Sequence, residues 1–221
     1  MIVRRFKSFE EMTQQVATLL AGHLRPAGPE PQGIMLSGGL TPLPAYRMLA
    51  ARAETAAANV HVLYSDERMV PKESPENNYA NTAPLVGACR VPEARILRVH
   101  TELRLEEAAD RYNRDLRAFV GRGGRLALGL LGLGADGHTA SLFSMEDIAR
   151  GEGRFAVAVP RPIPPYRVSV TAEFLRRFDQ LIFLVSGPDK SAIARTLVTA
   201  PDTIPAGRAV AGANYAALWI S

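Results

Sequence analysis

The residues best suited to chemistry lie in the segment Asp136-Gly-His-Thr139, which follows the apolar run Leu126–Leu131. A histidine can accept a proton from water near neutral pH, so His138 is a candidate general base for ester hydrolysis, and Asp136 could orient its ring. The structural alternatives are a hydrogen-bonded histidine without a catalytic role and capping of the next helix by Asp136 or Thr139. Because glycines surround His138 and a buried strand is predicted before it, we favour the catalytic interpretation.

A glycine-containing turn follows the apolar run Gly33–Leu36, and Pro42 after it is suited to start a helix. Glycines let backbone N–H groups approach a phosphate, and a helix N-terminus adds a favourable dipole. The structural alternative is a tight turn in which Thr41 caps the helix. The turn is neither a Walker loop nor a GxGxxG fingerprint, so no nucleotide is expected. Its residues are Ser37, Gly38, Gly39, Leu40 and Thr41.

Three charged residues, Asp66, Glu67 and Arg68, come directly after the predicted strand His61–Tyr64. Charges at such a position face either solvent or a ligand, and taken alone they would be assigned to a solvated loop. The segment Asn77–Tyr79 farther along is predicted to cap a helix.

Two cations are candidates for binding a phosphate. Lys190 is one of only three lysines and follows the apolar run Gln180–Val185. Arg167 supplies a fork of donors where a lysine supplies a point charge. The alternative for both is an ordinary surface charge, which is the assignment we expect for most other arginines.

The elements that must position these residues alternate between strands and helices, which indicates a mainly parallel sheet. A capping box at Ser8–Glu11 predicts a helix to about Leu20, and helical periodicity covers Glu106–Val120. Parallel strands end at one edge of a sheet, so the four turns should gather there, where open α/β sheets bind ligands. The remaining predicted elements are the strands Gly33–Leu36, His61–Tyr64, Leu126–Leu131, Arg167–Thr171 (half-buried), Gln180–Val185 and Ala216–Ile220, and a helix over Asp189–Leu197.

Composition narrows the classes of function. The 221 residues, 47% of them hydrophobic, fit one α/β domain over 1–221. A net charge of +4 would suit nucleic acid, but the arginines are scattered and no aromatic-basic motif occurs, so no nucleic-acid partner is expected. With Cys89 as the only cysteine, no internal disulfide is possible; we expect a core thiol in a reducing compartment.

Several other classes are not expected from the sequence. The N-terminus lacks the apolar stretch of a signal peptide, and no apolar run is long enough for a membrane helix. No His/Cys/carboxylate cluster has metal-ligand spacing, and no G-x-S-x-G elbow of a serine hydrolase occurs. The other histidines, His23, His61 and His100, are predicted to be structural.

Several of these segments together resemble the 6-phosphogluconolactonase family, in the expected order and over nearly the whole chain. The segment around His138 is the most specific. The sequence departs from the family pattern at Ser144, where proline is usual, at Asn77, where serine is usual, and in a short C-terminal segment after Pro205. The segments that carry the resemblance are Leu36–Pro42, Ser65–Pro71, Asn78-Tyr79, Gly132–Phe143, Pro165–Thr171 and Gly187–Lys190.

The resemblance implies a three-layer α/β/α domain with a mainly parallel, Rossmann-like sheet, and hydrolysis of 6-phospho-D-glucono-1,5-lactone. It implies a cytoplasmic enzyme of the pentose phosphate or Entner–Doudoroff pathway that binds this small molecule, with no cofactor, metal or membrane. His138 would activate water, Arg68 or backbone N–H groups would bind the oxyanion, and Asp66 and Glu67 would bind sugar hydroxyls or position Arg68. The phosphate would be held by Ser37, Gly38, Gly39, Thr41, Arg167 and Lys190.

Two competing functions remain to be distinguished. The related amino-sugar 6-phosphate deaminases typically carry a tyrosine where Arg68 stands and a glutamate where Phe143 stands, so both residues favour the lactonase. Non-catalytic sugar-phosphate sensors of this fold usually carry a separate DNA-binding helical domain, and no segment of this chain is left over to form one.

Overall fold

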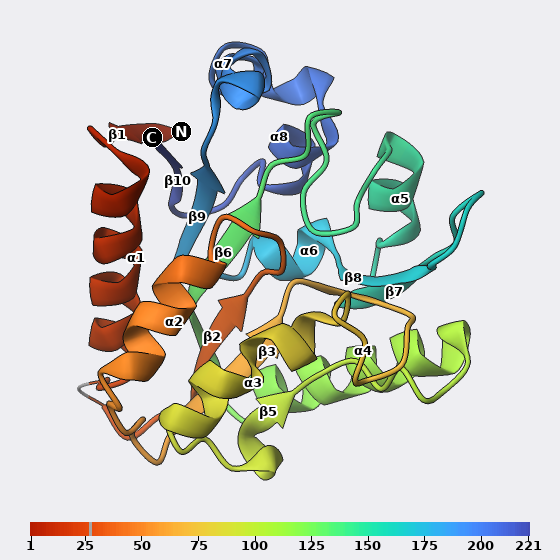
Figure 1. Cartoon of the computed structure of the whole chain (residues 1–221). Coiled ribbons are helices and arrows are strands. Elements are labelled where there is room, and N and C mark those ends of the chain that lie inside the picture. The colour runs from red at the N-terminus through yellow and green to blue at the C-terminus, as the bar shows by residue number, and fades with distance from the viewer. Residues whose placement is uncertain (27) are drawn as a thin grey trace.

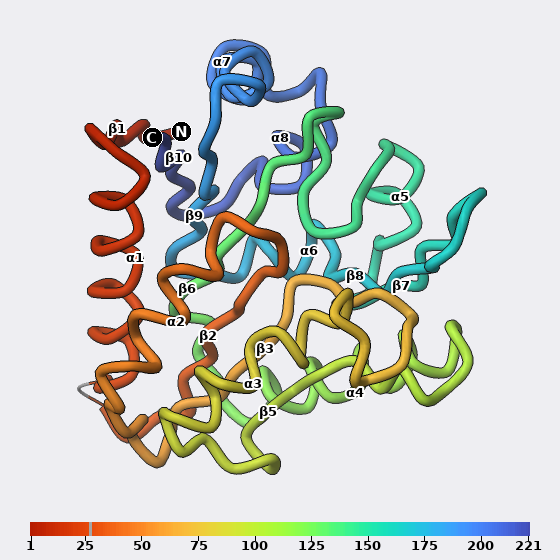
Figure 2. The backbone as a smooth tube through the Cα atoms, viewed as in Figure 1, coloured from red at the N-terminus to blue at the C-terminus, as the bar shows by residue number. Residues whose placement is uncertain are grey.

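A seven-stranded sheet forms the centre of the computed structural model, which describes residues 1–26 and 28–221. All neighbouring strands in it are parallel, in the order β1-β10-β9-β6-β2-β3-β5. The first and last strands pair in parallel, so the N-terminal strand lies beside the C-terminal one (Figure 2). The strands are β1 (Ile2–Arg5), β2 (Gln32–Leu36), β3 (Val60–Tyr64), β5 (Ile96–Leu97), β6 (Arg125–Gly132), β9 (Gln180–Val185) and β10 (Ala216–Ile220).

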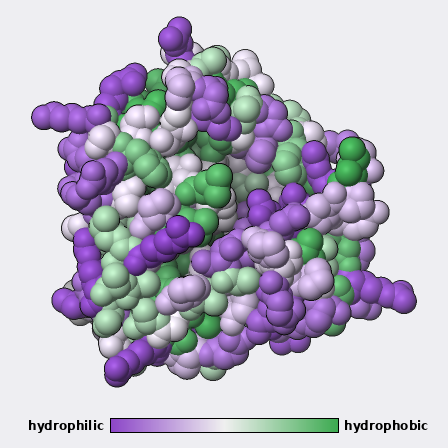
Figure 3. All heavy atoms as spheres, in the orientation of Figure 1, coloured by the Kyte–Doolittle hydropathy of each residue, from purple (hydrophilic) through white to green (hydrophobic). Residues whose placement is uncertain are grey.

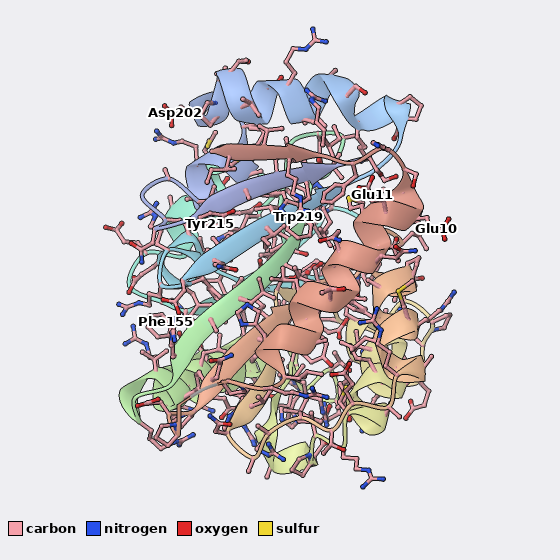
Figure 4. All side chains as sticks on the ribbon, turned by 90° about the vertical axis from the view of Figure 1, so that its left-hand side faces the viewer. Glu10, Glu11, Phe155, Asp202, Tyr215 and Trp219 are labelled. Carbon is pink, nitrogen blue, oxygen red and sulfur yellow. The ribbon has the colours of Figure 1, made fainter. Side chains whose placement is uncertain are left out.

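Helices cover both faces of this sheet and complete three layers (Figure 1). One face carries α1 (Phe9–His23), α2 (Leu43–Ala51) and α3 (Asn78–Ala88), which pack side by side. Figure 4 shows α1 crossing this face close to Trp219 of β10. The other helices are α4 (Leu105–Gly121), α5 (Met145–Arg150), α6 (Ala172–Leu175), α7 (Ser191–Thr199) and α8 (Pro205–Ala209).

Alternation along the strands builds one apolar core on each side of the sheet. In β2, Ile34 and Leu36 face the layer of α1, α2 and α3, whereas Met35 belongs to the opposite core. In β9, Ile182 and Phe183 divide in the same way. Strands buried on both faces need continuous apolar runs, which is why these segments were recognisable in the sequence.

A smaller antiparallel sheet of β4 (Asp66–Arg68), β8 (Arg167–Val170) and β7 (Ala156–Val159), in that order, stands beside the main one. Only Ser65 separates β3 from β4, so the chain passes directly from the large sheet into the small one. Arg68 pairs in register with Arg167. Helix α4 packs against β7 and β8 and joins the two sheets through the core.

The predicted strands of the main sheet are confirmed to within one residue at each end, and the capping box at Ser8 is formed, with the Ser8 hydroxyl accepting the Glu11 N–H at 3.1 Å. Three predictions need correction. Asp66–Arg68 is a strand instead of a turn. Arg167–Thr171 is not half-buried, because α4 and the core cover it beyond its first residue, and Thr171 caps α6. The helix predicted from Asp189 starts with a 3₁₀ turn and becomes α-helical at Ser191.

The surface shows no single dominant feature on the face drawn in Figure 3, where hydrophilic and hydrophobic residues are interspersed. Among the residues that the structure describes, every helix is too short or too polar to cross a lipid bilayer.

Candidate active site

The four turns predicted to carry chemistry follow β2, β3, β6 and β9, which are neighbouring parallel strands. They therefore end at the same edge of the sheet, as the sequence predicted. The strand order places the turn of His138 between that of Lys190 on one side and Ser37–Thr41 on the other. Neighbouring strands are about 4.8 Å apart, so one small ligand can contact all three turns.

His138 and Asp136 form a hydrogen-bonded pair. Asp136 Oδ1 lies 2.5 Å from His138 Nδ1 and 3.3 Å from the backbone nitrogen of the same residue. Burial opposes ionisation of Asp136, but the hydrogen bond and charge of His138 outweigh it and lower the pKa of this carboxyl. The carboxylate therefore makes Nδ1 the donor. Among the described residues Nε2 has no hydrogen-bond partner, and the side chain is 28% exposed, so this nitrogen is open to a water molecule.

The backbone of this turn depends on its glycines. A Cβ on Gly134 would lie 2.1 Å from His138 Nδ1 and 2.5 Å from Asp136 Oδ1, far inside van der Waals contact. Gly137 has a φ of +84°, which side chains rarely tolerate, and its carbonyl accepts the N–H of Ala206 at the start of α8. The pair is thus held by a turn that is tied to the body of the protein.

The helix-capping alternative for Asp136 and Thr139 does not hold. The next helix, α5, begins at Met145 and is capped by Ser144. The Thr139 hydroxyl instead donates to the Gly132 carbonyl at 2.9 Å. The Asp136 carboxylate instead accepts hydrogen bonds from the backbone N–H and the ring of His138.

Two buried tyrosines fix the points where two of the turns leave the sheet. The Tyr46 hydroxyl of α2 donates to the Ser37 carbonyl and accepts the Ser37 N–H, at 3.1 and 3.2 Å. The Tyr112 hydroxyl of α4 donates to the Tyr64 carbonyl at 2.6 Å and accepts the Tyr64 N–H at 3.0 Å. Burial raises the pKa of both hydroxyls, so they stay neutral and keep both roles.

Asp66 is buried in a network of hydroxyl groups. Its two carboxylate oxygens accept from the hydroxyls of Ser65 at 2.8 Å and Ser141 at 2.6 Å. Ser141 lies just beyond the turn of His138, and its N–H donates to Ser169 of β8 at 3.1 Å. The network therefore joins the turns after β3 and β6 to the small sheet.

Glu67 is 1% exposed, and its carboxylate accepts the backbone N–H groups of Arg68, Asn78 and Tyr79. Burial raises the pKa of Glu67 to about 7, although these hydrogen bonds favour the charged form. Of the two roles expected for Asp66 and Glu67, this geometry fits the positioning of Arg68 better than contact with sugar hydroxyls.

None of the three candidate cations at the site forms an ion pair with a carboxylate that the structure describes. Arg68 donates from Nη1 to the Glu76 carbonyl at 2.8 Å, and its buried Nε has no partner in the part of the chain described. Arg167 donates to the carbonyl oxygen of Pro165. Lys190 is half-buried in the 3₁₀ turn after β9, with no ion pair to a described carboxylate.

The turn after β2 is shaped by contact with Asn78. A Cβ on Gly38 would lie 2.0 Å from Asn78 Oδ1, so only glycine fits there. Asn78 Nδ2 donates to the Asp66 carbonyl at 2.8 Å, which links this turn to β4. Gly39 has a φ of +89°, and a Cβ on it would meet no atom within 4 Å, so the space beside its backbone is open. The Ser37 hydroxyl is buried without a partner among the described residues.

Sequence reasoning missed Asn78, Ser141 and Arg161 as members of this region. Asn77 caps α3 as predicted, with Oδ1 accepting the Ala80 N–H, but the contact between Asn78 and Gly38 has no sequence signal. Ser141 lay inside the recognised segment around His138 without being singled out.

The other histidines make local contacts. Nitrogen Nδ1 of each ring lies within hydrogen-bond distance of Gln32, the Asn59 carbonyl and Glu102 for His23, His61 and His100 respectively. Cys89 is buried in the core. Within the described ranges, no three His, Cys, Asp or Glu side chains are grouped so as to hold a metal ion.

Comparison with known proteins shows the family of the chain. Residues 7–219 match the family described as glucosamine-6-phosphate isomerases/6-phosphogluconolactonase. The 6-phosphogluconolactonase of Thermotoga maritima is 32% identical over 159 residues, which cover 71% of this chain and 70% of that protein. A human 6-phosphogluconolactonase is 32% identical over 173 residues, covering 74% and 67%.

Solved structures show the same fold. The crystal structure of the Thermotoga maritima 6-phosphogluconolactonase matches with a TM-score of 0.82 at 24% identity, over 99% of this chain and 98% of that one. A monomeric glucosamine-6-phosphate deaminase matches with a TM-score of 0.78 at 17% identity, over 100% and 97%. The chain shares the α/β fold of these proteins and carries its histidine–carboxylate pair at the carboxyl edge of the parallel sheet. The chain belongs to the glucosamine-6-phosphate isomerase/6-phosphogluconolactonase family, and its curated relatives named above are lactonases.

Proposed function

We propose that this protein hydrolyses 6-phospho-D-glucono-1,5-lactone to 6-phosphogluconate. The observation that carries the proposal is the His138–Asp136 pair, whose Nε2 is uncommitted among the described residues and lies at the sheet edge beside the turn of Gly38 and Gly39. The lactonase names of its relatives and the presence of Arg68 and Phe143, where the deaminases typically carry tyrosine and glutamate, support it.

In the proposed mechanism, Nε2 of His138 takes a proton from a water molecule as its oxygen attacks the lactone carbonyl carbon. Asp136 stabilises the imidazolium that forms, because its carboxylate already holds Nδ1. The tetrahedral intermediate then collapses, the bond between the carbonyl carbon and the ring oxygen breaks, and the imidazolium returns the proton to that oxygen. The free acid ionises after release.

The other site residues would stabilise the negative charge of the oxyanion or bind the phosphate. Arg68, positioned by Glu67 and Asp66, or nearby backbone N–H groups would stabilise the oxyanion. The phosphate would lie against the turn of Gly38 and Gly39, where the space beside the Gly39 backbone is open. The remaining groups proposed to hold it are Ser37, Thr41, Arg167 and Lys190.

The reaction class is tested with purified protein and freshly prepared lactone. We expect the protein to open the lactone well above the spontaneous rate, to release no ammonia from glucosamine 6-phosphate, and to keep its activity after treatment with a chelator. Ammonia release without lactone opening would replace this proposal with the deaminase function. A loss of activity that zinc restores would show a metal requirement.

The phosphate assignment is tested with Lys190→Ala. A charge-assisted hydrogen bond contributes about 1.5–3 kcal/mol, so kcat/KM for the phosphorylated lactone should fall about 10- to 150-fold. Plain gluconolactone, which has no phosphate, should be a poorer substrate that the substitution hardly affects. Lys7→Ala, on the exposed N-terminal segment, is the matched control. Equal effects on both lactones would remove Lys190 from the phosphate site.

A further inference from the structure

Arg161 stands beside the candidate base, although no motif marked it. It lies in the loop between β7 and β8, and its guanidinium carbon is 3.7 Å from the centroid of the Phe143 ring. The Phe143 ring also contacts the His138 imidazole, with 4.4 Å between ring centroids. One aromatic ring therefore contacts both this guanidinium and the proposed base.

Arg161 also belongs to a cluster of three arginines. Arg68 and Arg167 oppose each other in the β4–β8 pair. Burial and the charge of Arg68 lower the pKa of Arg167, and the charge of Arg161 contributes to the same shift. Arg68 and Arg161 are thus each close enough to repel Arg167, and the carboxylates of Asp66 and Glu76 offset part of this repulsion.

No carboxylate among the described residues forms an ion pair with any of the three. Arg68 and Arg167 donate to backbone carbonyls, and Arg161 is held over the Phe143 face. Of the other twenty arginines, twelve likewise form no ion pair among the described residues, and eight do pair with acidic side chains. These eight are Arg25, Arg98, Arg111, Arg125, Arg150, Arg154, Arg177 and Arg208.

Three neighbouring arginines that form no ion pair with a described carboxylate favour a bound anion. We propose that Arg161 is a specificity-determining residue that binds the phosphate of the substrate together with Arg167, an inference that rests on the proposed function. The described contacts link Arg161 to His138 through the Phe143 ring, so Arg161 need not touch the carbon attacked beside His138. The phosphate on C6 is separated from that carbon by the ring oxygen, C5 and C6, so it can reach the arginines while the carbonyl stays at the base.

Phe143 gives the guanidinium its orientation. Stacking on an aromatic face holds the guanidinium plane flat and leaves its edge N–H groups free for phosphate oxygens. A lysine at this position would keep the charge but lose both the stacking and the forked donors.

The proposal is tested with Arg161→Gln and Arg161→Lys, assayed on the phosphorylated and the plain lactone. The control is Arg117→Gln, because Arg117 stacks in the same manner on Phe155, away from the sheet edge that carries His138. We expect Arg161→Gln to lower kcat/KM about 10- to 150-fold for the phosphorylated lactone only, with a smaller loss for Arg161→Lys and none for Arg117→Gln. The inhibition constant for inorganic phosphate should rise most in Arg161→Gln, less in Arg161→Lys and not at all in Arg117→Gln.

A second measurement, independent of turnover, is the rise in melting temperature on adding inorganic phosphate. It should be smaller in the Arg161 variants than in the wild type and the control. Equal losses on both lactones would show that Arg161 acts through Phe143 and His138 and would overturn the proposal. An unchanged phosphate response would overturn it as well. If the wild type opens no lactone, the proposed function fails, and the phosphate response still decides whether Arg161 binds the anion.

Discussion

Two acidic segments follow buried strands at the same edge of the sheet, and they use their carboxylates in opposite ways. In Asp66–Glu67 both side chains are buried, and hydroxyl or backbone donors occupy their oxygens. In the turn after β6, Asp136 is 58% exposed and holds a histidine that has one ring nitrogen uncommitted among the described residues. A carboxylate whose acceptors are filled serves the fold, whereas one that orients an open base is available for chemistry.

The strongest test of this comparison is His138→Asn. Loss of a general base should lower kcat by about 10²- to 10⁴-fold, while the free energy of unfolding should hardly change, because the ring is partly exposed. The measurement is lactone hydrolysis by the purified variant, beside a denaturant melt.

Near-normal turnover in a folded His138→Asn variant would show that His138 is a structural histidine. His100→Asn is the matched control, because His100 also has Nδ1 bonded to a carboxylate, that of Glu102, but follows β5, the outermost strand, which is three places from β6 in the sheet. Its turnover should stay close to that of the wild type.

The pair Asp136→Asn and Asp66→Asn sharpens the contrast at the level of single carboxylates. Asp136→Asn removes a charge-assisted hydrogen bond to the base, so kcat should fall about 10- to 150-fold with little loss of stability. Asp66→Asn leaves one buried hydroxyl facing an amide, so the free energy of unfolding should fall by about 1–3 kcal/mol. Urea unfolding and steady-state kinetics on both variants check the two outcomes, and the reverse pattern would refute the comparison.

Much of the fold was predictable because strands that are buried on both faces need continuous apolar runs in the sequence. β2, β6 and β9 were found for that reason, and their shared direction placed the turns of Ser37, His138 and Lys190 at one edge. The close spacing of Asp136 and His138 likewise predicted their pairing. These are short-range signals, which a single sequence displays.

The features that sequence reasoning missed depend on contacts between distant segments. Ser141 reaches Asp66 across 75 positions, and the stacking of Arg161 on Phe143 depends on where the loop after β7 folds back. Asp66–Arg68 looked like a loop because charged residues are rare in buried strands. Only the pairing of β4 with β8 makes this segment a strand. No spacing rule in one chain carries such information.

Glu67→Gln should have the smallest effect on turnover, and it tests a carboxylate whose role is structural. The glutamine amide would place an NH₂ group against one of the backbone N–H donors of α3, so the free energy of unfolding should fall by about 1–3 kcal/mol at pH 8. The difference in free energy of unfolding between wild type and variant should grow as the pH falls. Burial raises the pKa of Glu67 to about 7 from its ordinary 4.5, so between these values the folded protein binds a proton that the unfolded chain does not.

Wild-type stability from this group is therefore fully present below pH 4.5 and is lost as pH rises through about 7, whereas glutamine does not titrate. Urea melts of wild type and variant at pH 5, 6 and 8 measure the gap, with Glu73→Gln, an exposed residue of the neighbouring loop, as the control. A gap that stays constant or narrows toward pH 5 would mean that the backbone N–H groups of Arg68, Asn78 and Tyr79 hold Glu67 ionised in spite of burial. Turnover by the folded variant should fall less than in Asp136→Asn, because Glu67 acts on the substrate only through the position of Arg68.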